Sequence, residues 1–127
     1  MNELKKILLV EDNPYIMNIN ARLLSMNGYE VLQATTATEA RELLKRSPAD
    51  LAVLDIMLPD GNGVDLCREL KSLYSIPVIF VTAMSAISDI TAYLQAGDDY
   101  MTKPYDLDDL LVRIERLLPP ETKETTI

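Results

Sequence analysis

Short apolar runs alternate along this chain with segments whose apolar residues recur every three or four positions. Runs of the first kind predict strands, and segments of the second kind predict amphipathic helices. The predicted strands are Lys6–Val10, Tyr29–Ala34, Leu51–Leu54, Val78–Val81 and a short Tyr100–Thr102. Three of them lack polar alternation, as strands covered on both faces do. Strand and helix units that follow one another in this way predict a parallel sheet.

Cap and turn residues set the ends of the first two helices. The first follows Asp12 and Asn13 as candidate caps and stops at Gly28. Its expected inner face consists of Ile16, Ile19, Leu23 and Leu24. The second opens on Thr36 and Glu39, which have the spacing of a capping box.

Three further helices complete the pattern. The third follows the turn-forming segment Pro59–Gly63, and the fourth runs from about Ala86 to Gln95. The fifth has Asp106 as its cap and a regular apolar stripe after it. Five strand–helix units predict an α/β fold of the flavodoxin-like, doubly wound (βα)5 type, with a five-stranded parallel sheet of strand order 2-1-3-4-5.

The 127 residues, 48% of them hydrophobic, have room for one compact domain. We expect it to span residues 1–118. Residues 119–127 are polar and aperiodic, and predict a tail or the start of a linker to an absent output domain.

Charge argues against two kinds of partner. The formal net charge of −8 disfavours direct contact of this domain with nucleic acid or an anionic membrane. No apolar run approaches the ~20 residues of a membrane span, and the N-terminal apolar run is too short for a signal peptide, so we expect a cytoplasmic protein.

The chain has no histidine and one cysteine, Cys67. Chemistry in this chain must therefore use carboxylates, hydroxyls and lysines.

Polar residues stand at or just beyond the carboxyl ends of four strands. Glu11 and Asp12 follow the first strand, Asp55 the third, Thr82 the fourth and Lys103 the fifth. Parallel strands present these ends at one edge of the sheet, where such folds bind ligands. Carboxylates brought together there need a hard cation such as Mg²⁺, beside which one of them can act as a nucleophile toward phosphorus. Asp55, at the centre of the sheet, is the best candidate.

Four stretches carry a resemblance to a known family. They are ILLVEDN, LAVLDIMLPDGNG, PVIFVTA and DDYMTKPYDLDDLL, and they lie between Lys5 and Leu118. In order and spacing the chain resembles a receiver domain of a bacterial two-component response regulator, of the winged-helix transcription-factor class. The resemblance implies a phosphorylation-activated switch that accepts a phosphoryl group from a sensor histidine kinase, and that is not an enzyme in the usual sense.

The resemblance also assigns roles to residues. Asp55 would be the phosphoacceptor, and Thr82 with Tyr100 would form the conformational switch. The expected Mg²⁺ ligands are Asp12, Asp55 and the backbone carbonyl of Met57, with Glu11 acting through water. The expected phosphate contacts come from Thr82, the backbone of Ala83 and Lys103.

The same resemblance implies a homodimer through the fourth helix, fifth strand and fifth helix. The candidate dimer face consists of Asp98, Asp99, Asp109, Arg113 and Arg116. DNA would be contacted only through the absent output domain, which would control transcription.

The chain departs from the family pattern at two places near this face. Gly97 is followed directly by Asp98, which leaves the loop one residue short. Ile90 and Gln95 replace charged residues of the class. The alternative is that the five charges of the candidate face only solvate it. Ile90 and Tyr93 are then an alternative docking patch for a different partner.

Met57 and Met84 stand where the family flanks the path of the hydrolytic water. Neither can orient a water, so the resemblance implies slow autodephosphorylation.

Three alternatives remain open. A phosphatase of the haloacid dehalogenase kind also uses an Asp nucleophile and Mg²⁺, but would need an acid where Met57 stands. A flavodoxin would need a hydroxyl-rich or glycine-rich phosphate loop after the first strand, where this chain has Glu11 and Asp12. Within the receiver family, the alternative is a stand-alone single-domain receiver that acts as a phosphorelay shuttle or protein-binding module.

Overall fold

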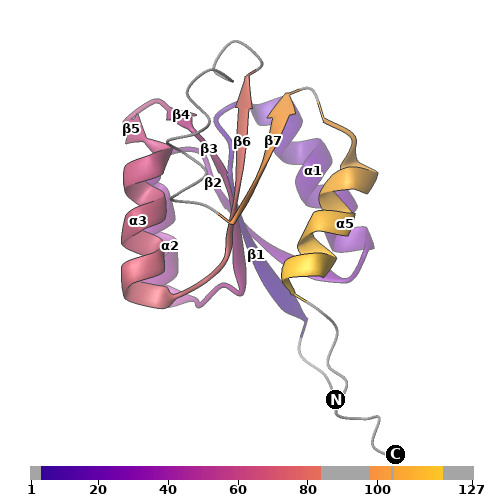
Figure 1. The fold of residues 1–127 in the computed structure, drawn as a ribbon, viewed down its shortest axis with the longest axis horizontal. Helices are drawn as coiled ribbons and strands as arrows, with labels where there is room; N and C mark the ends of the chain where they lie inside the picture. The colour runs from indigo at the N-terminus through magenta and orange to yellow at the C-terminus, as the bar shows by residue number, and fades with distance from the viewer. Residues whose placement is uncertain (1–3, 84–97, 104, 119–127) are drawn as a thin grey trace, which may run out of the picture.

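A five-stranded parallel sheet forms the centre of the computed structural model, which describes residues 4–83, 98–103 and 105–118 (Figure 1). Its strands are β1 (Lys5–Val10), β2 (Tyr29–Ala34), β3 (Leu51–Asp55), β6 (Val78–Ala83) and β7 (Asp99–Lys103). They are ordered β2-β1-β3-β6-β7. This confirms the predicted order, because β6 and β7 are the fourth and fifth strands of the sheet along the chain.

Helices cover both faces of the sheet. The described helices are α1 (Pro14–Met26), α2 (Ala37–Arg46), α3 (Gly63–Tyr74) and α5 (Leu107–Leu117). Figure 1 shows α2 and α3 on one face and α1 and α5 on the other, as a doubly wound fold requires. The predicted fourth helix, Ala86–Gln95, lies outside the described residues. No helix in the described ranges combines the length and the hydropathy that crossing a bilayer requires.

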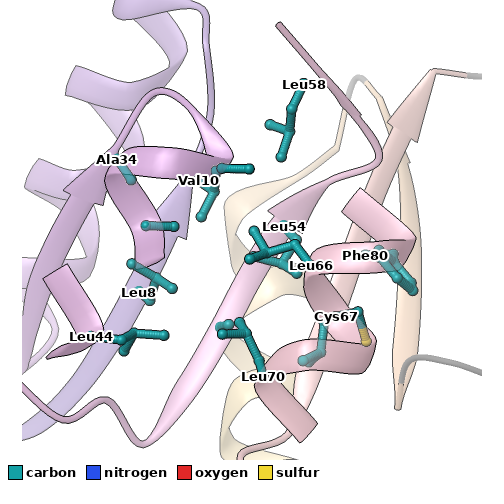
Figure 2. Packing of buried hydrophobic residues seen from close by; sticks show 14 of the residues in the cluster. Leu8, Val10, Ala34, Leu44, Leu54, Leu58, Leu66, Cys67, Leu70 and Phe80 are labelled. Carbon is teal, nitrogen blue, oxygen red and sulfur yellow. The ribbon is translucent and has the colours of Figure 1, made fainter. Parts of the chain in front are cut away.

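The sheet divides the hydrophobic core into two clusters. Alternate residues along β1 and β3 point to opposite faces, so that Leu8 and Leu54 belong to one cluster while Leu9 and Val53 belong to the other. Figure 2 shows the first cluster, to which the strands contribute side chains such as Phe80, while α2 contributes Leu44 and α3 contributes Leu66. The second cluster joins the sheet to α1 and α5. Strands buried on both faces explain the continuous apolar runs of the sequence.

Side-chain caps start the helices where the sequence placed them. The Asn13 side chain accepts hydrogen bonds from the N–H groups of Tyr15 and Ile16, so Asn13 and not Asp12 caps α1. Thr36 accepts from the N–H of Glu39 at the start of α2, and Asp106 accepts from Asp108 at the start of α5. These caps satisfy N–H groups that have no partner inside the helix.

The predicted inner face of α1 was right at Leu24 and wrong by about one position elsewhere. The buried residues of α1 are Met17, Asn20, Ala21 and Leu24, whereas Ile19 is 55% exposed. The buried set also has helical spacing, but it includes the polar residue Asn20. The sequence therefore favoured a face containing the isoleucines as the apolar stripe. Asn20 is accommodated there because its side-chain amide donates a hydrogen bond to the hydroxyl of Tyr105.

A small hairpin follows the central strand. β4 (Met57–Leu58) pairs with β5 (Gly61–Asn62) in antiparallel fashion, and Pro59 and Asp60 form the turn between them. The sequence predicted a turn here but not the strands, since two-residue strands are too short to show a periodicity.

Candidate functional site

The register of the sheet brings the polar residues beyond the strands to one edge. Val10 pairs with Leu54, so Glu11 follows β1 at the level at which Asp55 ends β3. Asp55 pairs with Val81, and Ala83 pairs with Lys103 at the ends of β6 and β7. Residues far apart in the sequence are thereby placed within side-chain reach, as the sequence predicted.

Asp55 is a buried carboxylate with two partners. Its side chain is 9% exposed, and its Oδ2 lies 2.8 Å from Nζ of Lys103. Its Oδ1 accepts a hydrogen bond of 3.1 Å from the N–H of Met57. The backbone of Asp55 is also tightly packed, because a Cβ on Gly63 would collide with the Asp55 carbonyl oxygen. Both the carboxylate and the backbone of Asp55 are therefore restrained.

Glu11 shares the same lysine. Its side chain is 4% exposed, and its Oε1 lies 2.9 Å from Lys103 Nζ. Its Oε2 accepts a hydrogen bond of 3.0 Å from the N–H of Asn13, the cap of α1. Asp12 is exposed at the mouth of the same cluster. Glu11 thus links the start of α1 to the lysine at the end of β7.

Lys103 remains charged in this setting. Burial by itself lowers the pKa of Lys103, but the hydrogen bonds to Asp55 and Glu11 outweigh it and raise the pKa above its ordinary value. Its ammonium group therefore neutralises part of the charge of the carboxylates around it.

The three carboxylates fit a divalent cation. One oxygen each from Glu11, Asp12 and Asp55 lies within 4.8 Å of the other two. Oxygens on opposite sides of one Mg²⁺ lie about 4.2 Å apart, twice its ~2.1 Å bond length, so one ion would require only a small closing movement. Three carboxylates and one lysine carry a formal charge of −2, which a divalent cation balances. The backbone carbonyl of Met57 follows on the adjoining hairpin.

Thr82 contributes a buried hydroxyl without a partner among the described residues. The residue is fully buried next to the end of β6, and no described group hydrogen-bonds to its Oγ1. A buried hydroxyl left unpaired costs free energy, so this hydroxyl is available to a ligand oxygen that reaches it.

The candidate switch and dimer residues are only partly brought together. Tyr100 is half-buried on β7 and packs against the cluster on the side of α2 and α3. Arg113 lies 2.6 Å from Asp99 and 3.3 Å from Asp109 in the same chain. Asp98 instead pairs with Lys71 of α3 at 2.5 Å, away from this group.

The remaining residues singled out by the sequence are either exposed or not described. Arg116 is exposed on the last turn of α5. Met84, Ile90, Tyr93, Gln95 and Gly97 lie outside the described residues.

Sequence reasoning missed two residues beside this edge. Tyr105, two positions after Lys103, lines an apolar hollow of about 420 Å³ with Ile16, Ile19, Asn20 and Lys103. Burial, followed by the nearby negative charge of Glu11, raises the pKa of Tyr105 to about 12.

Asp60 is the second missed residue. It lies in the hairpin turn and binds the start of α2. Turn chemistry explains an Asp at this place but gives no sign of its distant partner.

Comparison with known proteins identifies the class to which this fold and site belong. The family model described as the response regulator receiver domain matches residues 7–115. The chain therefore belongs to the response regulator receiver domain family. Receiver domains are phosphoryl-accepting signalling domains of two-component systems that bind Mg²⁺ in an acidic pocket, and they are not enzymes in the ordinary sense.

Curated relatives narrow the resemblance. The chain is 41% identical to "Response regulator MprA" of Mycobacterium leprae (strain TN) over 115 residues. These residues are 89% of this chain and 50% of that protein. It is 38% identical to "Heme response regulator HssR" of Staphylococcus aureus (strain Newman), over 87% of this chain and 50% of that protein. It is also 38% identical to "Probable transcriptional regulator ycf27" of Porphyridium aerugineum, over 90% of this chain and 48% of that protein. The chain thus spans about half the length of these relatives.

Solved structures agree in fold. A CheY-like response regulator receiver domain protein from Methanospirillum hungatei JF-1 has a TM-score of 0.87 and 33% identity, with 96% of this chain and 99% of that chain covered. The receiver domain of the TMAO respiratory system response regulator TorR has a TM-score of 0.84 and 36% identity, with 90% and 96% covered.

Proposed function

We propose that this domain is a phosphorylation-activated signalling switch in which Asp55 accepts a phosphoryl group from a sensor histidine kinase, with Mg²⁺ as cofactor. One observation carries the proposal: Asp55 is buried, lies 2.8 Å from Lys103, and stands within an acidic cluster of cation-binding size. We propose the cytoplasm, where ATP charges such kinases, as the place of the exchange.

The residues divide the chemistry among them. An oxygen of Asp55 attacks phosphorus as the bond from phosphorus to the imidazole nitrogen of the donor breaks, and the freed imidazole takes a proton from water. Mg²⁺, held by Asp12, Asp55 and the Met57 carbonyl with Glu11 through water, would draw charge from the phosphoryl oxygens. Lys103 neutralises negative charge on the other side of Asp55.

The new phosphoryl group would then reset the edge of the sheet. It would add about −2 charge and new acceptor oxygens, and in our proposal the Thr82 hydroxyl, the Ala83 N–H and Lys103 would contact them. A charge-assisted hydrogen bond contributes about 1.5–3 kcal/mol, so two of them approach the ~5.5 kcal/mol that inverts a 1:99 equilibrium. Movement of Thr82 would let Tyr100 turn inward and change the surface of β7 and α5.

The output that we propose is transcription, through a DNA-binding domain joined beyond residue 118. The support is the similarity to ycf27, a probable transcriptional regulator about twice as long as the matched region. The receiver itself would dimerise and leave DNA contact to that domain. A stand-alone phosphorelay shuttle or protein-binding module is the alternative function within the same family.

Intact-mass measurement tests the core of the proposal. The protein is incubated with acetyl phosphate, with and without Mg²⁺, beside Asp55→Asn and the control Asp65→Asn, an exposed aspartate on α3. We expect one phosphoryl group on the wild type and on Asp65→Asn, only with Mg²⁺, and none on Asp55→Asn. A folded wild-type protein that gains no phosphoryl group, or an Asp55→Asn variant that still gains one, would refute Asp55 as the acceptor.

A further inference from the structure

The β4–β5 hairpin that follows Asp55 is hydrogen-bonded to the start of α2. Asp60, in the turn between β4 and β5, accepts hydrogen bonds from the N–H groups of Ala37 at 2.8 Å and Thr38 at 2.9 Å. Its Oδ2 also accepts from the Thr38 hydroxyl at 2.7 Å. One side chain in the hairpin turn thus makes three bonds to the first turn of α2.

These bonds use groups that favour a carboxylate. The first N–H groups of a helix have no acceptor inside it, and the helix dipole favours negative charge at this end. The hydrogen bond from the Thr38 hydroxyl, followed by those from the backbone of Thr38 and Ala37, lowers the pKa of Asp60 to about 2. Asp60 is therefore charged at neutral pH.

α2 does not depend on Asp60 for its start. Thr36 is already its N-cap, with its hydroxyl accepting from the N–H of Glu39 at 3.0 Å. The Glu39 carboxylate in turn accepts from the N–H and hydroxyl of Thr35. The second cap, Asp60, is therefore not needed to start α2, but it restrains the hairpin.

The hairpin carries a proposed cation ligand. Met57 lies two residues beyond Asp55, and its N–H already orients Asp55 through Oδ1. Across the hairpin, Met57 pairs with Asn62, which caps α3 by accepting from the N–H of Val64 at 2.6 Å. The segment with Met57 is thus held at one end by α3 and at its tip by α2.

We infer that Asp60 is a positioning residue: by holding the hairpin tip on α2, it fixes the backbone of Met57 and the carboxylate of Asp55 for the divalent cation. The inference rests on the proposed function, since it concerns the same cation. It predicts that loss of Asp60 weakens Mg²⁺ binding although Asp60 is no ligand.

The test measures Mg²⁺ affinity by titrating MgCl₂ into isotope-labelled protein and following amide NMR signals near Asp55. We expect Asp60→Ala to raise the Kd for Mg²⁺ about tenfold, the low end of what loss of an outer-shell partner costs. Asp60→Asn keeps one acceptor oxygen and should give a smaller rise, and it decides the matter if Asp60→Ala does not fold. Thermal unfolding of each variant is recorded beside the titration.

Thr36→Ala is the matched control, because it removes the other cap of the same helix without touching the hairpin. It should lower the Tm about as much as Asp60→Ala and leave the Kd within about twofold of the wild type. A Kd unchanged in Asp60→Ala, or raised equally in Thr36→Ala, would overturn the inference and leave the proposed function standing. A wild-type protein that binds no Mg²⁺ would overturn both.

Discussion

Thr82 is a fully buried polar residue near the end of β6. Its hydroxyl is buried and has no hydrogen-bond partner among the described residues. Such a group destabilises the fold unless a ligand pairs with it. In our proposal this hydroxyl pairs with a phosphoryl oxygen, so the cost would fall on the unphosphorylated protein.

Thr82→Val should therefore stabilise the resting protein. Valine has nearly the same shape and lacks the unpaired hydroxyl, so we expect a free energy of unfolding higher by about 1 kcal/mol in urea titrations. The added stability that beryllofluoride with Mg²⁺ gives the wild type should be smaller in the variant. Thr102→Val, its register partner on β7, is the control and should not show this pair of effects. A destabilised Thr82→Val would contradict the assignment.

Met57 bears on the lifetime of the phosphoryl group. Its side chain is 69% exposed beside Asp55 and has no group that can orient a water. We expect slow autodephosphorylation and about a tenfold shorter lifetime in Met57→Asn, a modest share of the ~10²–10⁴-fold that positioned proton-transfer groups supply. Loss of the label is followed by intact mass, with Met26→Asn, another exposed methionine, as control. Rapid loss from the wild type that Met57→Asn does not accelerate would refute this role.

Asp60 predicts a pH dependence of stability. Its folded pKa of about 2 is below the ordinary 3.8, so its stabilising effect is complete above about pH 4 and is lost as the pH falls toward 2. The difference in unfolding free energy between the wild type and Asp60→Asn should thus be constant near neutrality and shrink below about pH 4. Urea titrations of both proteins across this pH range measure the difference. A difference for Asp60→Asn that persists unchanged to pH 2.5 would disprove the lowered pKa.

At the scale of elements, Gly63 decides how closely α3 approaches the central strand. A Cβ there would lie against the Asp55 carbonyl oxygen and 2.9 Å from Cα of Ile56. We expect Gly63→Ala to cost about 2 kcal/mol of stability, as overpacking does, and to slow phosphorylation by acetyl phosphate because Asp55 must shift. Urea unfolding and intact mass measure the two effects.

Gly61→Ala is the control for this prediction, since a Cβ at Gly61 meets nothing within 4 Å. It should leave both stability and phosphorylation nearly unchanged. Equal effects of the two substitutions would mean that the hairpin tolerates no alanine in general, and not that Gly63 permits a close approach to Asp55.

The elements themselves were largely predictable from sequence. Apolar runs gave the five strands, and caps at Thr36 and Asp106 gave two helix starts, because these signals are local. The inner face of α1 was not predictable, since the burial of Asn20 depends on Tyr105, 85 residues away. The hold of Asp60 on α2 escaped prediction for the same reason: its partners are distant in the sequence.

At the scale of the whole molecule, the edge formed by β7 and α5 is the candidate output surface. Arg113 binds Asp99 and Asp109 within one chain, so these charges are already paired in the resting protein. We expect beryllofluoride with Mg²⁺ to convert monomer to dimer in sedimentation experiments, and Arg113→Glu to prevent it. Arg68→Glu, on α3, should dimerise normally. Dimers that persist in Arg113→Glu would place the interface elsewhere.

The gathering of the site was predictable because parallel strands end at one edge, whatever their distance in the sequence. The identities Glu11, Asp55 and Lys103 therefore sufficed to predict the pocket. The sharing of one lysine by two carboxylates was not predictable, since it depends on how far the side chains that end β1, β3 and β7 reach toward one another.

The lysine shared by Asp55 and Glu11 is added late in synthesis. Lys103 lies 48 residues after Asp55 and 92 after Glu11, and it belongs to the last strand of the sheet. During synthesis the proposed acceptor, Asp55, leaves the ribosome before the lysine that neutralises it. If Asp55 accepts the phosphoryl group as we propose, we expect a nascent chain to become able to receive it only once β7 has been completed and Lys103 is in place.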